Sequence, residues 1–171
     1  MNMKKCKNLS LEILKYFVDL AVIPFEAFWN TPYKGASPKD FHNTIMSLQR
    51  SGYIERRQKH QKTYFQITPK GKRHLDFKIY PDSEKPKWDG KWRLLIFDVP
   101  EEKKKTRDYL RNCLKQLDFY QLQKSVWVTP YPVPDFLDDI IKEVGLLYSI
   151  RYIVVESVNY DRDLRRYFGL D

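Results

Sequence analysis

Residues 37–71 read SPKDFHNTIMSLQRSGYIERRQKHQKTYFQITPKG, and the character of this stretch changes once, at Gly52. Its first part carries the signals of a helix start. Ser37 is a good N-cap residue, Pro38 suits the first helical position, and Asp40 places a negative charge in the first turn. Glycine readily adopts the left-handed backbone that follows a helix terminus, so the predicted helix ends just before Gly52.

The predicted helix has two faces of opposite character. Phe41, Ile45 and Leu48 fall at i, i+4 and i+7 and form one apolar stripe. The other face carries side chains of the types that read base edges and phosphates in a major groove. These candidate contacts are Lys39, His42, Asn43, Ser47 and Arg50. We therefore expect the helix to pack by its apolar side and to present its polar side to a duplex.

Beyond Gly52 the pattern becomes that of a β-hairpin. Two strands are expected, at 53–57 and 62–68, with a tip at 58–61. No acidic residue lies between Arg57 and Lys70, so the tip is basic. A basic hairpin directly after an amphipathic helix is typical of a wing, which would lie along a phosphate backbone or in a minor groove. Its candidate contacts are Arg56, Arg57, Lys59, His60 and Lys62.

Charge is spread unevenly along the 171-residue chain, whose net charge is +9 at pH 7. Residues 1–78 hold 15 basic and 6 acidic residues, whereas residues 79–171 hold 16 of each. One part of the chain therefore carries the whole positive excess. This asymmetry predicts a polyanionic partner, and together with the helix and the wing it predicts double-stranded DNA. A basic surface that serves only solubility is the alternative.

No export or membrane signal is recognised in the sequence. Glu12, Lys15 and Asp19 interrupt the first apolar stretch at helical spacing, which predicts an amphipathic helix over 11–22 and not a signal peptide. No segment reaches the roughly 18 apolar residues that a membrane span needs. Two isolated cysteines favour a reducing compartment. The protein is therefore expected to be cytoplasmic, with no membrane partner.

Two further helices are expected in the first part, one at 25–29 and one that begins at Pro69 and is capped by Thr68. Residues 80–90, YPDSEKPKWDG, hold two prolines, one glycine and five charged residues, a composition typical of a linker. The predicted organisation is a winged helix-turn-helix domain at 1–78, a linker at 79–90 and a second domain at 91–171.

The second domain alternates strand and helix signals. Strands are expected at 92–97, 119–122, 125–129 and 151–155. Helices are expected at 101–117 and 135–144. This order is that of a ferredoxin-like (βαββαβ) fold. The predicted fold class is α+β, a winged helix-turn-helix followed by a ferredoxin-like domain.

The segments SLQRSGYIERR and KTYFQITPKGKRHL resemble winged-helix transcriptional regulators. In that family a helix ends in Gly-Tyr-Ile, and the second wing strand runs into Thr-Pro-Lys-Gly. The resemblance implies that the helix at 37–51 recognises DNA. A winged helix that serves protein contacts is the alternative.

Residues 88–132 resemble two related families. The Trp-Asp-Gly lead-in at 88–90, the Phe-Asp-Val-Pro element at 97–100 and the run at 123–132 resemble the middle domain of the PaaX family of bacterial repressors. The Asp-Val-Pro element and the Gln-x-Ser-Val-aromatic strand also resemble the small CRISPR-associated adaptation nuclease. The order of a winged helix, this domain and then residues 163–170 looks like PaaX.

The PaaX resemblance implies a sequence-specific repressor that binds an inverted-repeat operator as a homodimer, held together by residues 91–171. PaaX proteins continue beyond the position of Asp171 into a C-terminal domain. This chain is expected to lack that domain and, with it, the acyl-coenzyme-A ligand of the family. The alternative is a CRISPR-adaptation protein, either a Mg²⁺-dependent nuclease or a structural dimer that contacts an integrase.

Asp98 is the one candidate for catalysis, and we expect a binding protein more than an enzyme. In the adaptation nucleases the aspartate that ends the first strand binds metal, and the resemblance puts Asp98 at that position. Two copies across a dimer could share a Mg²⁺ ion, the only cofactor indicated. Otherwise Asp98 caps the following helix or hydrogen-bonds neighbouring amides. The nearby Lys103, Lys104, Lys105 and Arg107 are either extra phosphate contacts or a solvated helix face.

Overall fold

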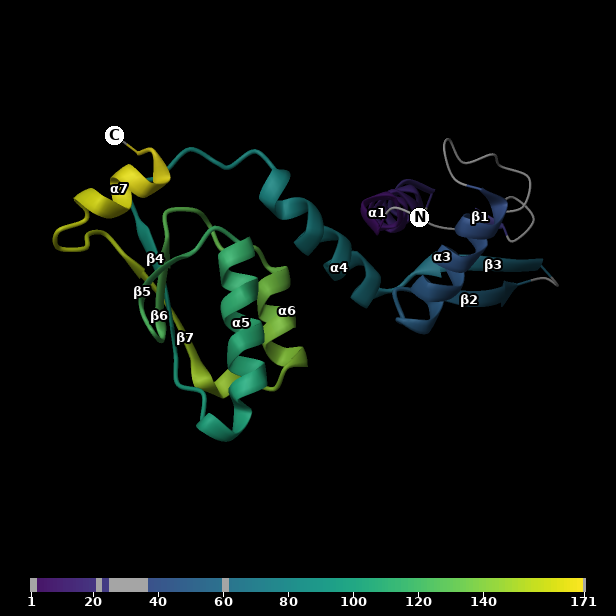
Figure 1. Cartoon of the computed structure of the whole chain (residues 1–171). Coiled ribbons are helices and arrows are strands. Elements are labelled where there is room, and N and C mark those ends of the chain that lie inside the picture. The colour runs from purple at the N-terminus through teal and green to yellow at the C-terminus, as the bar shows by residue number, and fades with distance from the viewer. Residues whose placement is uncertain (1–2, 21–22, 25–36, 60–61, 171) are drawn as a thin grey trace. The chain divides into compact units, whose positions relative to one another are not determined.

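The computed structural model describes residues 3–20, 23–24, 37–59 and 62–170, and contacts divide the chain into two compact units, Met1–Lys78 and Ile79–Asp171 (Figure 1). Each unit has its own antiparallel sheet. The strand order is β1-β3-β2 in the first unit and β5-β6-β4-β7 in the second. The predicted α+β class is confirmed. None of the helices in the described ranges has the length and apolar character that crossing a lipid bilayer requires.

The first unit combines helices with a small sheet. Its helices are α1 (Met3–Leu20), α3 (Pro38–Arg50) and α4 (Pro69–Ile79). Its strands are β1 (Ile23–Pro24), β2 (Ile54–Lys59) and β3 (Lys62–Ile67). The helix and hairpin expected at 37–51 and 53–68 therefore form, whereas the helix expected at 25–29 lies outside the described residues. The first helix begins earlier than expected, at Met3 instead of Leu11.

The core of the first unit is formed by the apolar stripes of its helices and by the inner side of the hairpin. Ile45 and Leu48 of α3 are buried, as are Phe17 of α1 and Ile54 and Phe65 of the hairpin. Helix α1 contacts both α3 and β3, so it holds α3 against the sheet. Burial of a leucine or isoleucine side chain stabilises a fold by about 1.5–3 kcal/mol. The orientation of α3 is therefore determined by its apolar stripe.

A single corner connects α3, the hairpin and α4. The Thr68 hydroxyl donates to the carbonyl of Gly52 at 2.6 Å and accepts from the backbone N–H of Gly71 at 3.0 Å. The Thr68 N–H donates to the carbonyl of Tyr53 at 2.9 Å. Gly71 lies so close to that carbonyl that a Cβ on it would be 2.0 Å from the oxygen. The Gly-Tyr-Ile and Thr-Pro-Lys-Gly motifs thus meet in space, and only glycine fits at position 71.

The second unit has the expected βαββαβ order. Its strands are β4 (Trp92–Phe97), β5 (Tyr120–Gln123), β6 (Val126–Thr129) and β7 (Ile150–Val155). Its helices are α5 (Lys104–Gln116), α6 (Phe136–Glu143) and α7 (Arg162–Phe168), the last of which was not expected. β4 pairs with both β6 and β7, so the two βαβ halves interleave as in a ferredoxin-like sheet.

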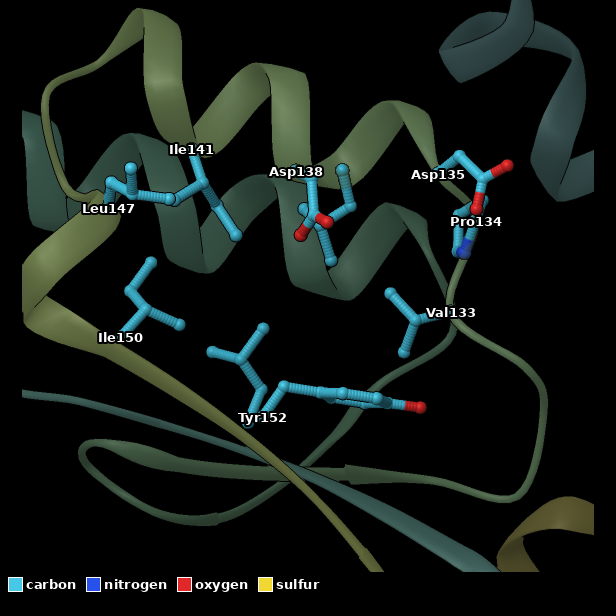
Figure 2. Close-up of a pocket in the computed structure, with 10 residues that line it drawn as sticks. Val133, Pro134, Asp135, Asp138, Ile141, Leu147, Ile150 and Tyr152 are labelled. Carbon is cyan, nitrogen blue, oxygen red and sulfur yellow. The ribbon is translucent and has the colours of Figure 1, made fainter.

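Helices α5 and α6 lie side by side on one face of the second sheet (Figure 1). Leu114 of α5 and Leu137 of α6 are fully buried, as is Trp127 of β6. The packing is incomplete between α6 and β7, where a cavity of about 280 Å³ remains (Figure 2).

Helix α7 packs on part of the opposite face of this sheet. Leu164 of α7 packs with Trp92 and Val128 in a buried cluster. The indole N–H of Trp92 donates to the Asp161 carboxylate at 3.3 Å, and the same oxygen accepts from Arg165 Nε at 2.9 Å. These contacts attach the last helix of the chain to the first strand of the unit.

Residues 79–90, expected to be a linker, make specific contacts with the second unit. Lys85 Nζ lies 3.1 Å from the Asp118 carboxylate and 3.6 Å from the ring centre of Tyr80. The Tyr80 ring packs edge-on against Phe136 at 5.9 Å. The indole N–H of Trp88 donates to the carbonyl of Lys91 at 2.9 Å. The segment therefore belongs structurally to the unit that follows it.

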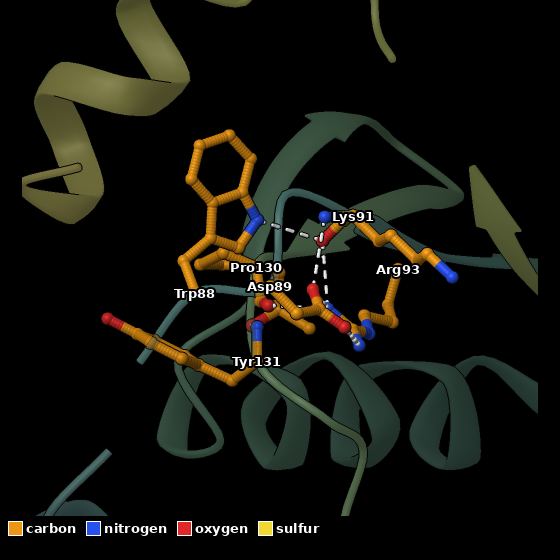
Figure 3. Close-up of polar contacts among 7 residues, drawn as sticks. Trp88, Asp89, Lys91, Arg93, Pro130 and Tyr131 are labelled. Carbon is orange, nitrogen blue, oxygen red and sulfur yellow. Dashed lines mark hydrogen bonds and ion pairs between the residues drawn. The ribbon is translucent and has the colours of Figure 1, made fainter. Parts of the chain in front are cut away.

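Asp89 and Arg93 form the tightest polar contact of this segment (Figure 3). The two terminal guanidinium nitrogens of Arg93, Nη1 and Nη2, donate to the Asp89 carboxylate, at 2.6 and 2.5 Å. Arg93 Nη1 also donates to the carbonyl of Pro130 at 2.7 Å, and the Arg93 side chain is only 9% exposed. The hydrogen bonds from Arg93 lower the pKa of Asp89 from 3.8 to about 2. A nearly buried cation is thus paired and hydrogen-bonded, as burial requires.

Replacing Gly71→Ala should destabilise the first unit, because the new methyl group would collide with the Tyr53 carbonyl. We expect a loss of about 3 kcal/mol, at the upper end for an overpacking substitution. Amide hydrogen exchange in α3 and the hairpin would then accelerate about a hundredfold. Lys72→Ala, an exposed change on the same helix, is the control. Equal exchange rates in Gly71→Ala and the wild type would refute the close contact.

Replacing Asp89→Asn should lower the stability of the second unit at neutral pH. The pKa of Asp89 is depressed in the folded state, so its contribution is fully present above the unfolded value near 3.8 and disappears as the pH falls through about 2. Urea midpoints of the wild type and the variant, followed from pH 6 to pH 2, should therefore converge at low pH. Asp82→Asn, an exposed acid of the same segment, is the control. A gap between the midpoints that is independent of pH would contradict this role.

Candidate nucleic-acid interface

Helix α3 presents its predicted polar face to solvent. Its N-terminus is fixed by Ser37, whose side chain accepts from the Asp40 N–H at 3.1 Å. Thr44 is buried on the inner side, and its hydroxyl donates to the carbonyl of Asp40 at 2.7 Å. The exposed side chains of the opposite side are Lys39, Asn43, Ser47 and Arg50, and His42 is half-buried beside them.

The hairpin carries exposed cations beside this helix. Arg56, Arg57 and Lys62 are exposed, and Arg57 pairs with Glu55 at 2.8 Å. An exposed pair of this kind is worth at most about 1 kcal/mol and does not prevent Arg57 from contacting a phosphate. The backbone of Lys59 pairs with that of Lys62 at the end of the hairpin. The Lys59 side chain and all of His60 lie outside the described part of the structure.

The connection between α3 and the hairpin is short and hydrogen-bonded. The Tyr53 N–H donates to the carbonyl of Leu48, and the Gly52 N–H donates to the carbonyl of Gln49, both at 2.9 Å. Gly52 has φ +71°, the left-handed backbone expected after a helix. The last turn of α3 therefore leads directly into β2, and the exposed faces of both elements are held in one arrangement.

Helix α4 contributes cations that the sequence reasoning did not select. Lys70 and Lys72 are exposed in its first turn, and Lys70 Nζ lies 5.6 Å from the ring centre of Tyr53. The Tyr53 ring also stacks on His74 at 4.2 Å, and burial, followed by the charges of Lys78 and Lys70, lowers the pKa of His74. His74 is therefore a neutral packing residue at pH 7. The Thr-Pro-Lys-Gly-Lys run was the available signal for these lysines.

Acidic groups are scarce in this region. Residues 37–78 contain ten basic residues and only three acidic ones, Asp40, Glu55 and Asp76. Asp40 accepts a hydrogen bond from the Ser37 hydroxyl at 2.9 Å, and Glu55 pairs with Arg57. The positive charge is consequently left largely uncompensated at the surface formed by α3, the hairpin and the start of α4. A surface of this kind attracts phosphates from a distance of about a Debye length.

Asp98 follows β4 and is exposed at the strand end. Its backbone N–H donates to the carbonyl of Ser149 at 2.9 Å. The helical turn after it, Glu101–Lys103, has Pro100 at its N-cap position and no side-chain cap, so the expectation that Asp98 caps this turn is not met. Among the described residues no three His, Cys, Asp or Glu side chains gather in a way that could hold a metal ion. Asp98 therefore belongs to no such group in the part of the chain that the structure describes.

The basic run that follows Asp98 is divided by the structure. Lys103, Lys104 and Lys105 are exposed. Arg107 is less available for a phosphate contact. Its Nη1 pairs with Glu101 at 2.8 Å and donates to the carbonyl of Val99 at 3.4 Å. The hydrogen bond from Arg107 lowers the pKa of Glu101. Arg107 therefore fixes the start of α5, and the three lysines remain as candidate phosphate contacts.

A family model matches most of the second unit. Residues 85–165 match the family model described as the PaaX protein central Cas2-like domain, which confirms the resemblance of this part to the PaaX middle domain. The matched region begins inside the segment that was expected to be a linker. No curated protein matches the chain significantly.

Among solved structures, an uncharacterized protein, Rv0674 from Mycobacterium tuberculosis, is similar to this chain. The TM-score is 0.42 and the sequence identity 19%, over 77% of this chain and 53% of that one. The chain thus spans about half the length of that protein.

Proposed function

We propose that the first unit is a winged helix that binds double-stranded DNA. Helix α3 enters the major groove, and the β2–β3 hairpin is the wing on the flanking backbone. The observation that carries this proposal is the exposed polar side of α3 beside a hairpin and helix start with a strong excess of basic residues. The apolar side of α3 is buried and its polar side is exposed next to the hairpin. The helix can therefore dock on a duplex without rearrangement of the core of the first unit.

The side chains suggest a division of work between sequence reading and positioning. Asn43 and Arg50 carry groups that pair with two acceptors or donors of a base edge. The Lys39 ammonium group suits a phosphate contact. The Ser47 hydroxyl suits a contact with either a phosphate or a base edge. The exposed Arg56, Arg57 and Lys62, with Lys70 and Lys72, supply charge for the backbone.

We further propose that the second unit holds two copies together, so that the protein acts as a dimeric regulator of the PaaX type. β7 is the last strand of the order β5-β6-β4-β7, and its outer edge is unpaired among the described residues. Tyr152, Ile153 and Val154 of this strand are 48%, 41% and 50% exposed. An apolar edge strand readily pairs with another chain. A two-fold axis at this edge would relate the α3 helices of two chains by symmetry. A symmetric dimer of this kind would recognise an inverted-repeat operator.

A CRISPR-adaptation protein, with an integrase as a partner, is the second candidate. Its support is the match of residues 85–165 to a Cas2-like domain and the position of Asp98 at the end of the first strand of that domain. A Mg²⁺ site at Asp98 would combine carboxylates from two chains, because Asp98 belongs to no metal-binding group among the described residues of one chain. Since the regulator accounts for the charge of the first unit and this alternative does not, we favour the regulator.

Selection of duplexes from a randomised library by the full-length chain tests the proposal. A dimeric regulator enriches an inverted repeat whose half-sites are about one helical turn, or a multiple of it, apart. Retention of duplexes without enrichment of any sequence would argue against specific regulation.

Variants of the interface should separate base reading from phosphate contact. Arg50→Ala is expected to weaken binding to the selected duplex by about 1–3 kcal/mol and to relax the base preference. Lys62→Ala should weaken binding evenly across sequences and reduce the slope of log K against log salt by about one unit. Fluorescence anisotropy across a salt series measures both quantities.

Lys115→Ala, an exposed change in the second unit, is the control for these measurements. If Arg50→Ala and Lys62→Ala behave alike on every duplex, the assignment of α3 to base reading is wrong.

The oligomeric state should depend on the β7 edge. Ile153→Lys is expected to shift the protein from dimer to monomer in sedimentation velocity, because it places a charge on the pairing strand. Leu122→Lys is the matched control, since it is a similarly exposed position on the opposite edge strand β5. A monomeric wild type, or a dimer lost only in Leu122→Lys, would contradict the assignment of the edge.

A further inference from the structure

The cavity between α6 and β7 has apolar walls (Figure 2). Leu95 of β4 and Ile150 of β7 contribute from the sheet, and Leu137 and Ile141 contribute from α6. The ring of Tyr152 lies along the side of the cavity that faces the sheet. The volume of about 280 Å³ is close to the lower limit, roughly 300 Å³, of pockets that bind small organic molecules.

Two acidic residues line the cavity. The carboxylate of Asp138 points from α6 towards the sheet, and Asp135 lies farther along, next to Pro134 (Figure 2). No lysine, arginine or histidine is among the residues that line the cavity. Neither carboxylate has a basic partner within the described ranges, whereas the adjacent Asp139 lies 3.9 Å from Lys142. The negative charge at the cavity is therefore unbalanced.

A cation near the cavity is already paired. Arg93 is close to Tyr152 but is not among the residues that line the cavity, and its charge is held by Asp89 in the bidentate pair described above. An anionic ligand would consequently meet two carboxylates and no free positive charge. A ligand with a positive group would find a partner in Asp138 and an apolar wall for the rest of its surface.

We propose that this cavity binds a small organic molecule composed of an apolar, aromatic body and a protonated amine. The body fills the space between α6 and the Tyr152 ring, and the ammonium group pairs with Asp138. An aromatic body is favoured because it can pack on the Tyr152 face. The site lies wholly within the second unit and does not depend on DNA binding by the first.

Isothermal titration calorimetry of the full-length chain with tryptamine tests the proposal. Saturable binding with a stoichiometry of one per chain is expected. The neutral analogue 3-methylindole should bind less tightly, and the anionic 3-indolepropionate should bind least. Equal affinity for tryptamine and 3-indolepropionate, or no binding of any of the three at millimolar concentration, would overturn the proposal.

Variants show whether the ligand occupies this cavity. Asp138→Asn should lower the affinity for tryptamine by about three- to tenfold, the effect of one partly exposed charge pair, and should leave 3-methylindole unchanged. Asp139→Asn, on the same helix but outside the lining, should bind tryptamine as the wild type does. Val133→Trp, at the wall of the cavity, should abolish binding while the circular dichroism spectrum is retained. Equal losses in Asp138→Asn and Asp139→Asn would place the ligand elsewhere.

Discussion

The contact between Gly71 and the carbonyl of Tyr53 is the constraint on which the first unit depends. It brings the start of α4 against the turn between α3 and β2, and Thr68 satisfies the polar groups that meet there. Because the same corner ends both α3 and the hairpin, the relative placement of these two elements is not adjustable. A rigid helix and wing can present their cations together, which is what a duplex with regularly spaced phosphates requires.

The second unit is organised by a comparable corner around residues 88–93. Trp88 lies against Arg165 of α7, with the guanidinium carbon 4.7 Å from the ring centre, while Asp89 holds Arg93 and, through it, the carbonyl of Pro130. One short segment thus links the last helix, the first strand and the end of β6. The unit keeps a continuous sheet with one apolar edge, at β7, and an incompletely filled interior on its helix-covered face.

Local signals predicted much of this architecture. Ser37, Pro38 and Gly52 act through the backbone next to them, so the ends of α3 could be located without knowledge of the rest of the fold. The prolines and charges of the segment at 79–90 are typical of a linker, whereas Asp118, which pairs with Lys85, and Arg93, which pairs with Asp89, lie outside that segment. For the same reason sequence could not distinguish Arg107, which is bound to Glu101, from the exposed lysines before it. Individual ion pairs such as these leave no periodic signal in the sequence.

Site-specific photo-crosslinking tests most directly which surface faces the duplex. A crosslinking amino acid in place of Asn43, on the exposed side of α3, is compared with one in place of Gln116, on the exposed end of α5. If the account is right, irradiation of the full-length chain with duplex DNA joins protein to DNA from position 43 and not from position 116. Crosslinks from position 116 alone, or none from position 43 under conditions in which the duplex is bound, would contradict it.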